Sequence, residues 1–187
     1  LTLIPQLSAE FEAQFGRASG GLIRGYRTED AETIVVALGS VIGTVQEVVD
    51  DMRASGVAIG CVSICSFRPF PLAALREVLE RARRVVVLEK SLAVGLGGIV
   101  SDGVRKALSG VPVNGYTIIA GLGGRAITHT SLRQVFEDAG ADDVPPAQSR
   151  REPAETGRHG QERQQQHAQG LSQQQAGGDS GAVRAGE

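Results

Sequence analysis

The middle of the chain alternates short, nearly continuous apolar runs with amphipathic stretches. The first run, residues 33–38 (TIVVAL), is rich in β-branched residues. Such a run is typical of a strand that is buried on both faces, as strands are in parallel sheets. Residues 57–66, 85–88 and 116–120 have the same character. These four runs predict the parallel part of a buried sheet.

Apolar residues recur at helical spacing between these runs. The first helix has an apolar stripe of Val45, Val48, Val49 and Met52. Thr44 and Glu47 match a T-x-x-E capping box before that stripe, and Gly56 is a typical helix stop. A strand, a helix and a second strand of this length form a βαβ unit, which is nearly always right-handed.

Two further helices and a short final one are predicted. Pro71 opens the second helix, at a position where the missing amide of proline does no harm. The third spans residues 99–109 and contains Gly103, where we expect the helix and the sheet to approach closely. Leu132, Val135 and Phe136 form the apolar side of the last helix. Strands that alternate with helices predict an α/β fold.

The two ends of the chain differ from this pattern. Residues 1–21 are expected to be a linker or approach segment, in which Ser8 caps a short helix with Phe11 and Phe15 on its apolar side. Residues 22–26 fit a short edge strand, so the predicted domain spans 22–141. Residues 142–187 are rich in glutamine and glycine and are predicted to be a disordered low-complexity tail, or a non-native end read in a shifted frame.

Composition narrows the class of protein. The net charge of −2 argues against a general nucleic-acid or membrane-surface role. No apolar run approaches the roughly 20 residues that span a bilayer. Two cysteines and the lack of a secretory pattern at the start fit a cytoplasmic protein. Because the first residue is leucine, we expect the chain to be a piece of a larger protein.

Two glycine-rich turns resemble parts of nucleotide-binding motifs. Gly121-x-Gly123-x-x-Ala126 matches a relaxed dinucleotide fingerprint between a strand and a helix. No acidic residue follows on a further strand to hold a ribose, so a tight turn is favoured. Residues 39–44 (GSVIGT) resemble half of a phosphate loop but lack its lysine. A helix start can bind an anion through backbone amides alone, and this alternative stays open.

The cysteines and histidines give no complete site. Cys61 and Cys65 are four apart on one predicted strand, so they lie about 13 Å apart on the same face. They are therefore too far apart to form a disulfide with each other, and they are interpreted as small buried hydrophobic residues. His129, His159 and His167 are too scattered for a catalytic triad. We predict no catalytic residue, no metal site and no cofactor site in this chain.

Four residues are candidates for a protein interface. Phe67, Arg68 and Phe70 lie in a proline-rich stretch at a predicted strand end, and Arg68 either fastens its own loop or pairs with an acidic group of a partner. Glu89 ends another strand, at the carboxyl edge where open α/β sheets place ligands. It either interacts with a cofactor of a partner or is a solvated strand end.

Three stretches together resemble a known family. They are residues 25–32 with 35–40 (GYRTEDAE and VVALGS), residues 67–71 (FRPFP), and residues 121–125 (GLGGR). Their order resembles the second domain of the α subunit of pyruvate:ferredoxin oxidoreductase and related 2-oxoacid:acceptor oxidoreductases. The resemblance covers roughly residues 15–139.

The resemblance implies both a fold and a role. The fold would be a three-layer α/β/α sandwich with a mostly parallel five-stranded sheet, similar to the carboxyl-terminal domain of transketolases, with an antiparallel first strand. Enzymes of this family convert a 2-oxoacid to an acyl-CoA and pass electrons to ferredoxin. The resemblance implies that thiamine diphosphate, iron–sulfur clusters and CoA belong to the full enzyme. The partners would be its other domains and subunits, including a thiamine-binding β subunit, and ferredoxin through the complex, with no nucleic acid or membrane.

Two alternatives remain open from the sequence. The first is the corresponding domain of a thiamine-dependent 2-oxoacid dehydrogenase E1 component. The second is a freestanding nucleotide-binding α/β module. The FRPFP and GLGGR stretches favour the ferredoxin-dependent family over the E1 component.

Overall fold

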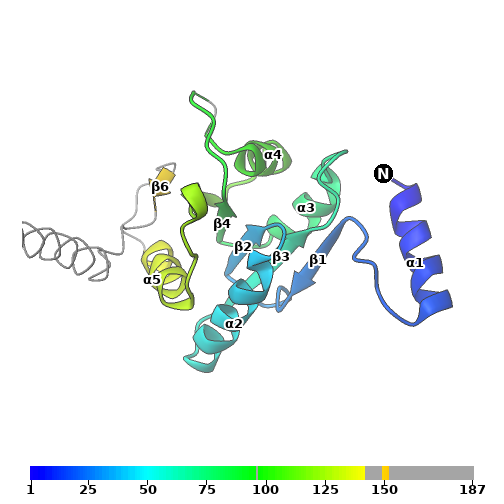
Figure 1. Ribbon diagram of the computed structural model, residues 1–187, viewed down its shortest axis with the longest axis horizontal. Helices are drawn as coiled ribbons and strands as arrows, with labels where there is room; N and C mark the ends of the chain where they lie inside the picture. Colours follow the sequence, from blue (N-terminus) through cyan, green and yellow to red (C-terminus); the bar gives the residue numbers. More distant parts are fainter. Residues whose placement is uncertain (96, 142–148, 152–187) are drawn as a thin grey trace, which may run out of the picture. The chain divides into compact units, whose positions relative to one another are not determined.

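A computed structural model describes residues 1–95, 97–141 and 149–151 of the chain. These residues build a sheet with the strand order β1-β3-β2-β4-β5-β6 (Figure 1). The strands are β1 (Ile23–Tyr26), β2 (Thr33–Ala37), β3 (Ile59–Ile64), β4 (Arg84–Glu89), β5 (Asn114–Ile119) and β6 (Ser149–Arg151). β1 pairs antiparallel with β3, and all other neighbours are parallel.

The predicted five-stranded, mostly parallel sheet is confirmed, including the antiparallel edge strand over residues 22–26. The sixth strand was not predicted. β6 pairs with β5 through backbone hydrogen bonds, and its sequence Ser-Arg-Arg carries no apolar alternation by which it could be recognised. The rest of the predicted tail lies outside the described residues.

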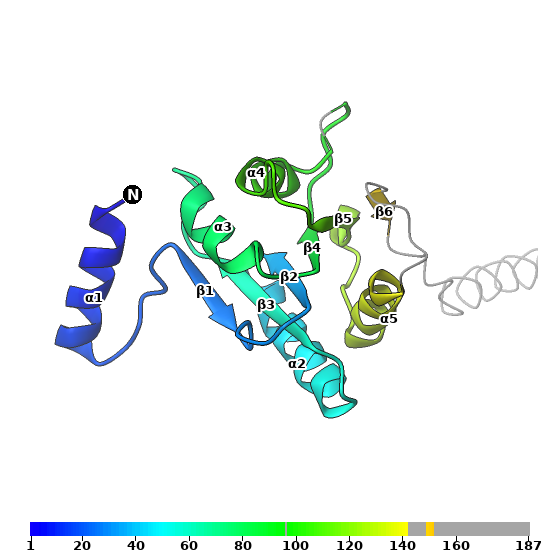
Figure 2. The same cartoon turned by 180° about the vertical axis from the view of Figure 1, so that it is seen from behind.

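Four helices cover the two faces of the sheet. α2 (Val41–Ala54) and α5 (His129–Gly140) lie on one face, and α3 (Leu72–Leu79) and α4 (Ile99–Ala107) lie on the other (Figures 1 and 2). All five residues of β2 and all six of β4 are buried, as the β-branched runs predicted. The three-layer α/β/α arrangement expected for the family is therefore present.

The capping box predicted at Thr44 and Glu47 is wrong. Helix α2 begins at Val41, and its N-cap residue Ser40 makes no side-chain capping hydrogen bond. Thr44 therefore lies inside the helix and not at its N-cap position. A reciprocal capping box exists instead at the start of α5, where the Ser131 amide donates to the Thr128 hydroxyl and the Thr128 amide donates to the Ser131 hydroxyl.

The amino-terminal segment forms an amphipathic helix that buries none of its residues. α1 (Leu3–Phe15) begins five residues before Ser8, so Ser8 is not its cap, contrary to the prediction. The Ser8 hydroxyl instead lies 2.6 Å from that of Ser19. The rings of Phe11 and Phe15 are 4.7 Å apart between centroids, on the apolar side that the sequence predicted.

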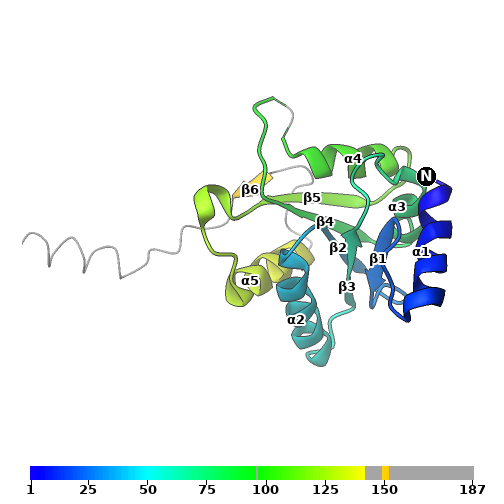
Figure 3. The same cartoon turned by 45° about the vertical axis from the view of Figure 1, so that its right-hand side comes forward.

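The topology brings four loops to one edge of the sheet. Because β2, β3, β4 and β5 are mutually parallel, their carboxyl ends meet at that edge. We call the four loops that leave it, residues 38–40, 65–71, 90–95 with 97–98, and 120–128, the carboxyl edge. Figure 3 shows the loops after β4 and β5 on the same side of the molecule. The chain order reverses between β2 and β4, which is where open α/β sheets usually bind ligands.

Candidate functional site

The four interface candidates predicted from the sequence lie in the carboxyl edge or directly beside it. Phe67, Arg68 and Phe70 lie in the loop between β3 and α3, and Glu89 is the last residue of β4. The glycine corner at residues 121–124 lies in the loop after β5, beside the loop after β4. Sequence reasoning placed these segments at separate strand ends, and the sheet order makes them neighbours.

Arg68 is exposed and held by its own loop. Its guanidinium carbon lies 4.1 Å from the centroid of the Phe67 ring, and its Nη1 donates a hydrogen bond of 3.0 Å to the Phe67 carbonyl. Within the described part of the chain, no carboxylate forms an ion pair with it. The guanidinium therefore has donors left over for an external acceptor, and its position is set by the ring beneath it.

Phe70 packs into its own domain. Its ring meets that of Phe67 edge to face, with centroids 6.0 Å apart, and both rings contact the core between α3 and α4. The ring of Phe70 occupies the space in front of Gly103 in α4, where an added Cβ would collide with it. Gly103 was expected to allow a close approach of helix and sheet, but the group that approaches is the aromatic ring.

Glu89 is not a solvated strand end, which was one of its two predicted roles. It is 5% exposed and accepts hydrogen bonds from the amides of Val100 (2.9 Å) and Ser101 (3.1 Å). The Ser101 hydroxyl donates a further bond of 2.7 Å. An added Cβ at Gly98 would overlap the carboxylate. Glu89 thus caps α4, whose own N-cap residue is a glycine without a side chain.

The sequence carries a signal for this role of Glu89. The N-cap position of α4 is Gly98 and not Ser, Thr, Asp or Asn, so the first amides of the helix need an acceptor from elsewhere. A carboxylate suits the positive end of a helix dipole, and the preceding strand supplies one.

The two cysteines differ, although the sequence assigned both to the interior. Cys61 in β3 is buried, and burial raises the pKa of its thiol to about 11. Cys65 lies just beyond the end of β3 and is exposed, so its interpretation as a small buried hydrophobic residue is wrong. β3 ends at Ile64, so Cys65 is no longer part of the strand. The alternation of side chains that would have placed it on the same face as Cys61 therefore does not apply to it.

The glycine corner forms a turn and does not open a helix directly. Gly121 and Gly123 both have positive φ, and residues 122–124 form a single 3₁₀ turn. α5 begins only at His129, and the Thr128 and Ser131 side chains already occupy its amino end. A dinucleotide fingerprint places its phosphate on the start of the following helix, so this geometry favours the turn.

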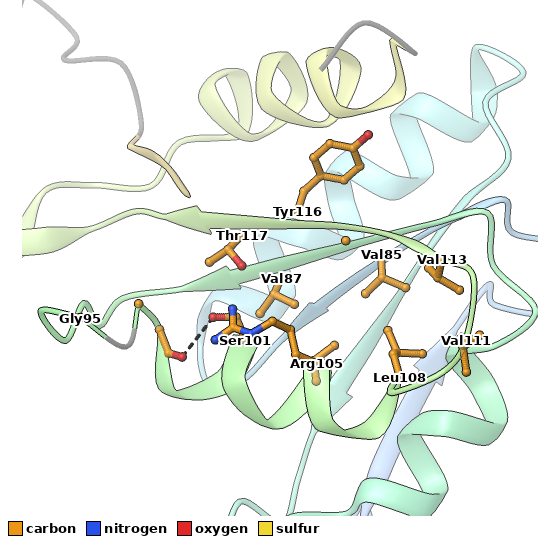
Figure 4. Close-up of a pocket in the computed structure, with 14 residues that line it drawn as sticks. Val85, Val87, Gly95, Ser101, Arg105, Leu108, Val111, Val113, Tyr116 and Thr117 are labelled. Atoms are coloured by element: carbon orange, nitrogen blue, oxygen red, sulfur yellow. Dashed lines mark hydrogen bonds between the residues drawn. The ribbon is translucent and has the colours of Figure 1, made fainter. Parts of the chain in front are cut away.

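An apolar groove of about 520 Å³ lies beside the carboxyl edge, between α4 and the strands β4 and β5. Figure 4 shows Val85, Val87 and Leu108 directed into it, whereas the Tyr116 side chain points to the opposite face of the sheet. Gly115 of β5 is exposed and Thr117 is half-buried where they line this groove.

The described residues contain neither a metal-binding cluster nor a helix that could span a membrane. In residues 1–95, 97–141 and 149–151, no group of three His, Cys, Asp or Glu side chains is placed to hold a metal ion. Over the same residues, no helix combines the length and the apolarity that crossing a membrane requires.

Comparison with known proteins identifies the family. The sequence model of "Pyruvate:ferredoxin oxidoreductase core domain II" matches residues 31–132. This match spans more than half of the chain, and its matched region includes β2, β3, β4 and β5 with the loops that follow them. The chain belongs to the pyruvate:ferredoxin oxidoreductase core domain II family. This result agrees with the resemblance seen in the sequence and favours it over the E1 component.

Individual relatives agree with the family. The chain is 43% identical over 143 residues to pyruvate synthase subunit PorA of Methanosarcina barkeri, covering 72% of this chain and 35% of that protein. It is 40% identical over 140 residues to PorA of Thermotoga maritima, and 34% identical over 138 residues to ketoisovalerate oxidoreductase subunit VorA of Pyrococcus horikoshii; each covers 73% of this chain and 35% of that protein. The chain therefore spans about a third of the length of these curated relatives.

Among solved structures, the chain is similar to 2-oxoglutarate:ferredoxin oxidoreductase from Magnetococcus marinus, with a TM-score of 0.49 and 18% identity over 70% of this chain and 21% of that one. A split-gene transketolase gives a TM-score of 0.47 and 24% identity, over 62% of this chain and 41% of that one.

Proposed function

We propose that this chain is the second domain of the α subunit of a pyruvate or other 2-oxoacid:ferredoxin oxidoreductase, and that it serves there as a structural and interface domain. The complete enzyme would decarboxylate a 2-oxoacid oxidatively, form an acyl-CoA and reduce ferredoxin. Thiamine diphosphate, iron–sulfur clusters and CoA would be bound by other domains and subunits, including a thiamine-binding β subunit. The family match and the names of the PorA relatives support this proposal.

One observation carries the interface role. The edge where such sheets usually bind ligands presents side chains that are already used structurally or that suit protein contacts. Glu89 is bonded to α4, and Phe70 fills the space in front of Gly103. Arg68, stacked on Phe67, is exposed and retains free donors. A stacked arginine is among the groups that most often anchor protein interfaces.

The proposal predicts that Arg68→Ala in the complete enzyme reduces assembly before it reduces turnover. Removing the guanidinium deletes an exposed donor without emptying the core, so we expect the assembled fraction to fall about tenfold at limiting subunit concentration. Turnover per assembled complex should stay within about twofold, because no reacting group is lost. Size-exclusion chromatography and the specific activity of the assembled fraction measure the two quantities.

Arg81→Ala is the matched control for that experiment, because Arg81 is an exposed arginine at the opposite edge of the sheet. It should leave assembly unchanged. Normal assembly of Arg68→Ala together with lost turnover would place the 65–71 loop in the active site, and the interface role would then be wrong.

A further inference from the structure

We propose that the whole carboxyl edge is a docking surface, and that its partner is an aliphatic surface bearing carboxylates on another domain or subunit of the same enzyme. This inference rests on the proposed function. It extends the interface from one loop to four, and it adds the chemistry of the partner. Three independent features of the edge support it: its exposed aliphatic side chains, its charge and the shape of its surface.

Exposed aliphatic side chains are concentrated at this edge. Among the described residues after α1, seven large hydrophobic side chains are exposed. Val57 alone of these lies at the opposite edge of the sheet. The other six lie in the four loops or at the first residue of the helix that follows: Leu38, Leu72, Leu92, Val94, Ile99 and Leu122. Scattered exposed aliphatics are ordinary, but their concentration on one edge indicates an interaction site.

Val94 is the most exposed of them, and the loop that carries it is anchored. Its relative exposure is 103%, so no described residue covers it. The backbones of Ala93 and Gly97 exchange two hydrogen bonds, of 2.7 and 2.9 Å, across this loop. Glu89 fixes the start of α4 immediately after the loop. An apolar group held in place in this way loses little conformational entropy when a partner binds.

The charges of the four loops have one sign. The loops contain Arg68, Lys90 and Arg125, all exposed, and no aspartate or glutamate, while Asp102 in the first turn of α4 is paired with Lys106 and Arg105. The start of α2 also faces this edge and has no side-chain cap and no acidic residue in its first turn, so its dipole adds positive potential. The loops at the opposite edge carry both signs, for example Glu29, Asp30 and Arg81. A complementary partner surface must therefore supply carboxylates.

The shape of the surface at this edge favours a macromolecular partner over a small ligand. At the reversal of strand order, the loops after β2 and β4 present Leu38, Gly39 and Ser40 beside Ser91 and Leu92. A small-molecule site needs a concave pocket with several convergent polar groups. One groove runs from Gly95, Gly97 and Gly98 of the loop after β4 into the space between α4 and β5, and valine, leucine and glycine make up most of its lining.

Substituting Val94 in the complete enzyme tests the proposal. Val94→Glu places an acid among the aliphatics and opposite the partner's carboxylates, so we expect it to weaken assembly at least about tenfold. Val57→Glu is the matched control: it makes the same change at an exposed position of the opposite edge, and it should assemble normally. Because both valines are exposed, the denaturation midpoints of the two variants should equal that of the parent.

Charge reversal gives an independent second test. The pair Lys90→Glu and Arg125→Glu should weaken assembly and make it less sensitive to salt, because attractive charge pairs are lost. Normal assembly of Val94→Glu together with normal assembly of the charge-reversed pair would overturn the docking surface. It would leave the proposed function intact, since that function is tested separately by the assembly and the turnover of the Arg68→Ala enzyme.

A second copy of the chain is the competing occupant. Sedimentation of the 187-residue chain alone decides this point. The proposal expects Val94→Glu to leave its oligomeric state unchanged. Self-association that Val94→Glu abolishes would assign the surface to a homodimer and overturn the proposal.

Discussion

Glu89→Ala is expected to destabilise the domain by about 3 kcal/mol, since it leaves the buried amides of Val100 and Ser101 at the start of α4 without an acceptor. The carboxylate is 5% exposed, so water cannot readily replace it. The helix would also lose a negative charge near the positive end of its dipole. Urea denaturation of the 187-residue chain, followed by circular dichroism, measures the change.

Glu77→Ala is the control for this substitution. Glu77 is exposed on α3, and no hydrogen bond or ion pair that would be lost is found for it among the described residues. Its removal should change stability by less than about 0.5 kcal/mol. Equal midpoints for the two variants would mean that Glu89 does not cap α4, and the anchor of the 90–98 loop would have to be sought elsewhere.

The effect of Gly103→Ala on the stability of the domain is expected to depend on the residue at position 70. The substitution should destabilise the chain that has Phe70 and stabilise the chain that has alanine there. In the parent chain the new methyl group collides with the Phe70 ring, and overpacking of this kind costs about 1–3 kcal/mol. In a Phe70→Ala background the collision disappears. The same change should then stabilise α4 by up to about 1 kcal/mol, because alanine favours helices more than glycine does.

Gly43 in α2 provides the control for the Gly103 cycle. It also lies within a helix, but an added Cβ there meets nothing within 4 Å. Gly43→Ala should therefore be stabilising in both backgrounds. If Gly103→Ala has the same effect with and without Phe70, then the ring does not occupy this space, and Phe70 would be available for an interface.

The sheet could be predicted from the sequence because its signals are local. The runs of β2 and β4 are buried on both faces, and their short length and β-branched residues are typical of buried strands. The family resemblance added the antiparallel edge strand. β6 could not be found, since Ser149–Arg151 has no pattern of its own and pairs only because β5 offers an open edge.

The candidate site was harder to predict because its chemistry depends on contacts between distant residues. Whether Glu89 is solvated or buried depends on the start of α4, eleven residues away in sequence from its Val100 partner. Likewise, Phe70 was predicted to be an interface residue, but its ring packs against Gly103 within the same domain. The T-x-x-E pattern at Thr44 failed because the helix begins before it, which periodicity alone does not fix.

The carboxyl edge was visible in the sequence only as separate loops. Leu92, Val94 and Leu122 gave no signal as binding residues, because single aliphatics in loops are common. The signal that could have found them is the topology. Each follows a strand of the predicted parallel sheet, so they had to meet at one edge.

Amide hydrogen exchange of the complete enzyme, compared with that of the 187-residue chain alone, tests the central claim most directly. If the carboxyl edge is the docking surface, amides in the loops after β4 and β5, such as those of Val94 and Leu122, should exchange at least about tenfold more slowly in the complete enzyme. Amides of residues 27–32, at the opposite edge, should exchange equally in both. Unchanged exchange at Val94 and Leu122, with protection appearing only at residues 27–32, would contradict the account.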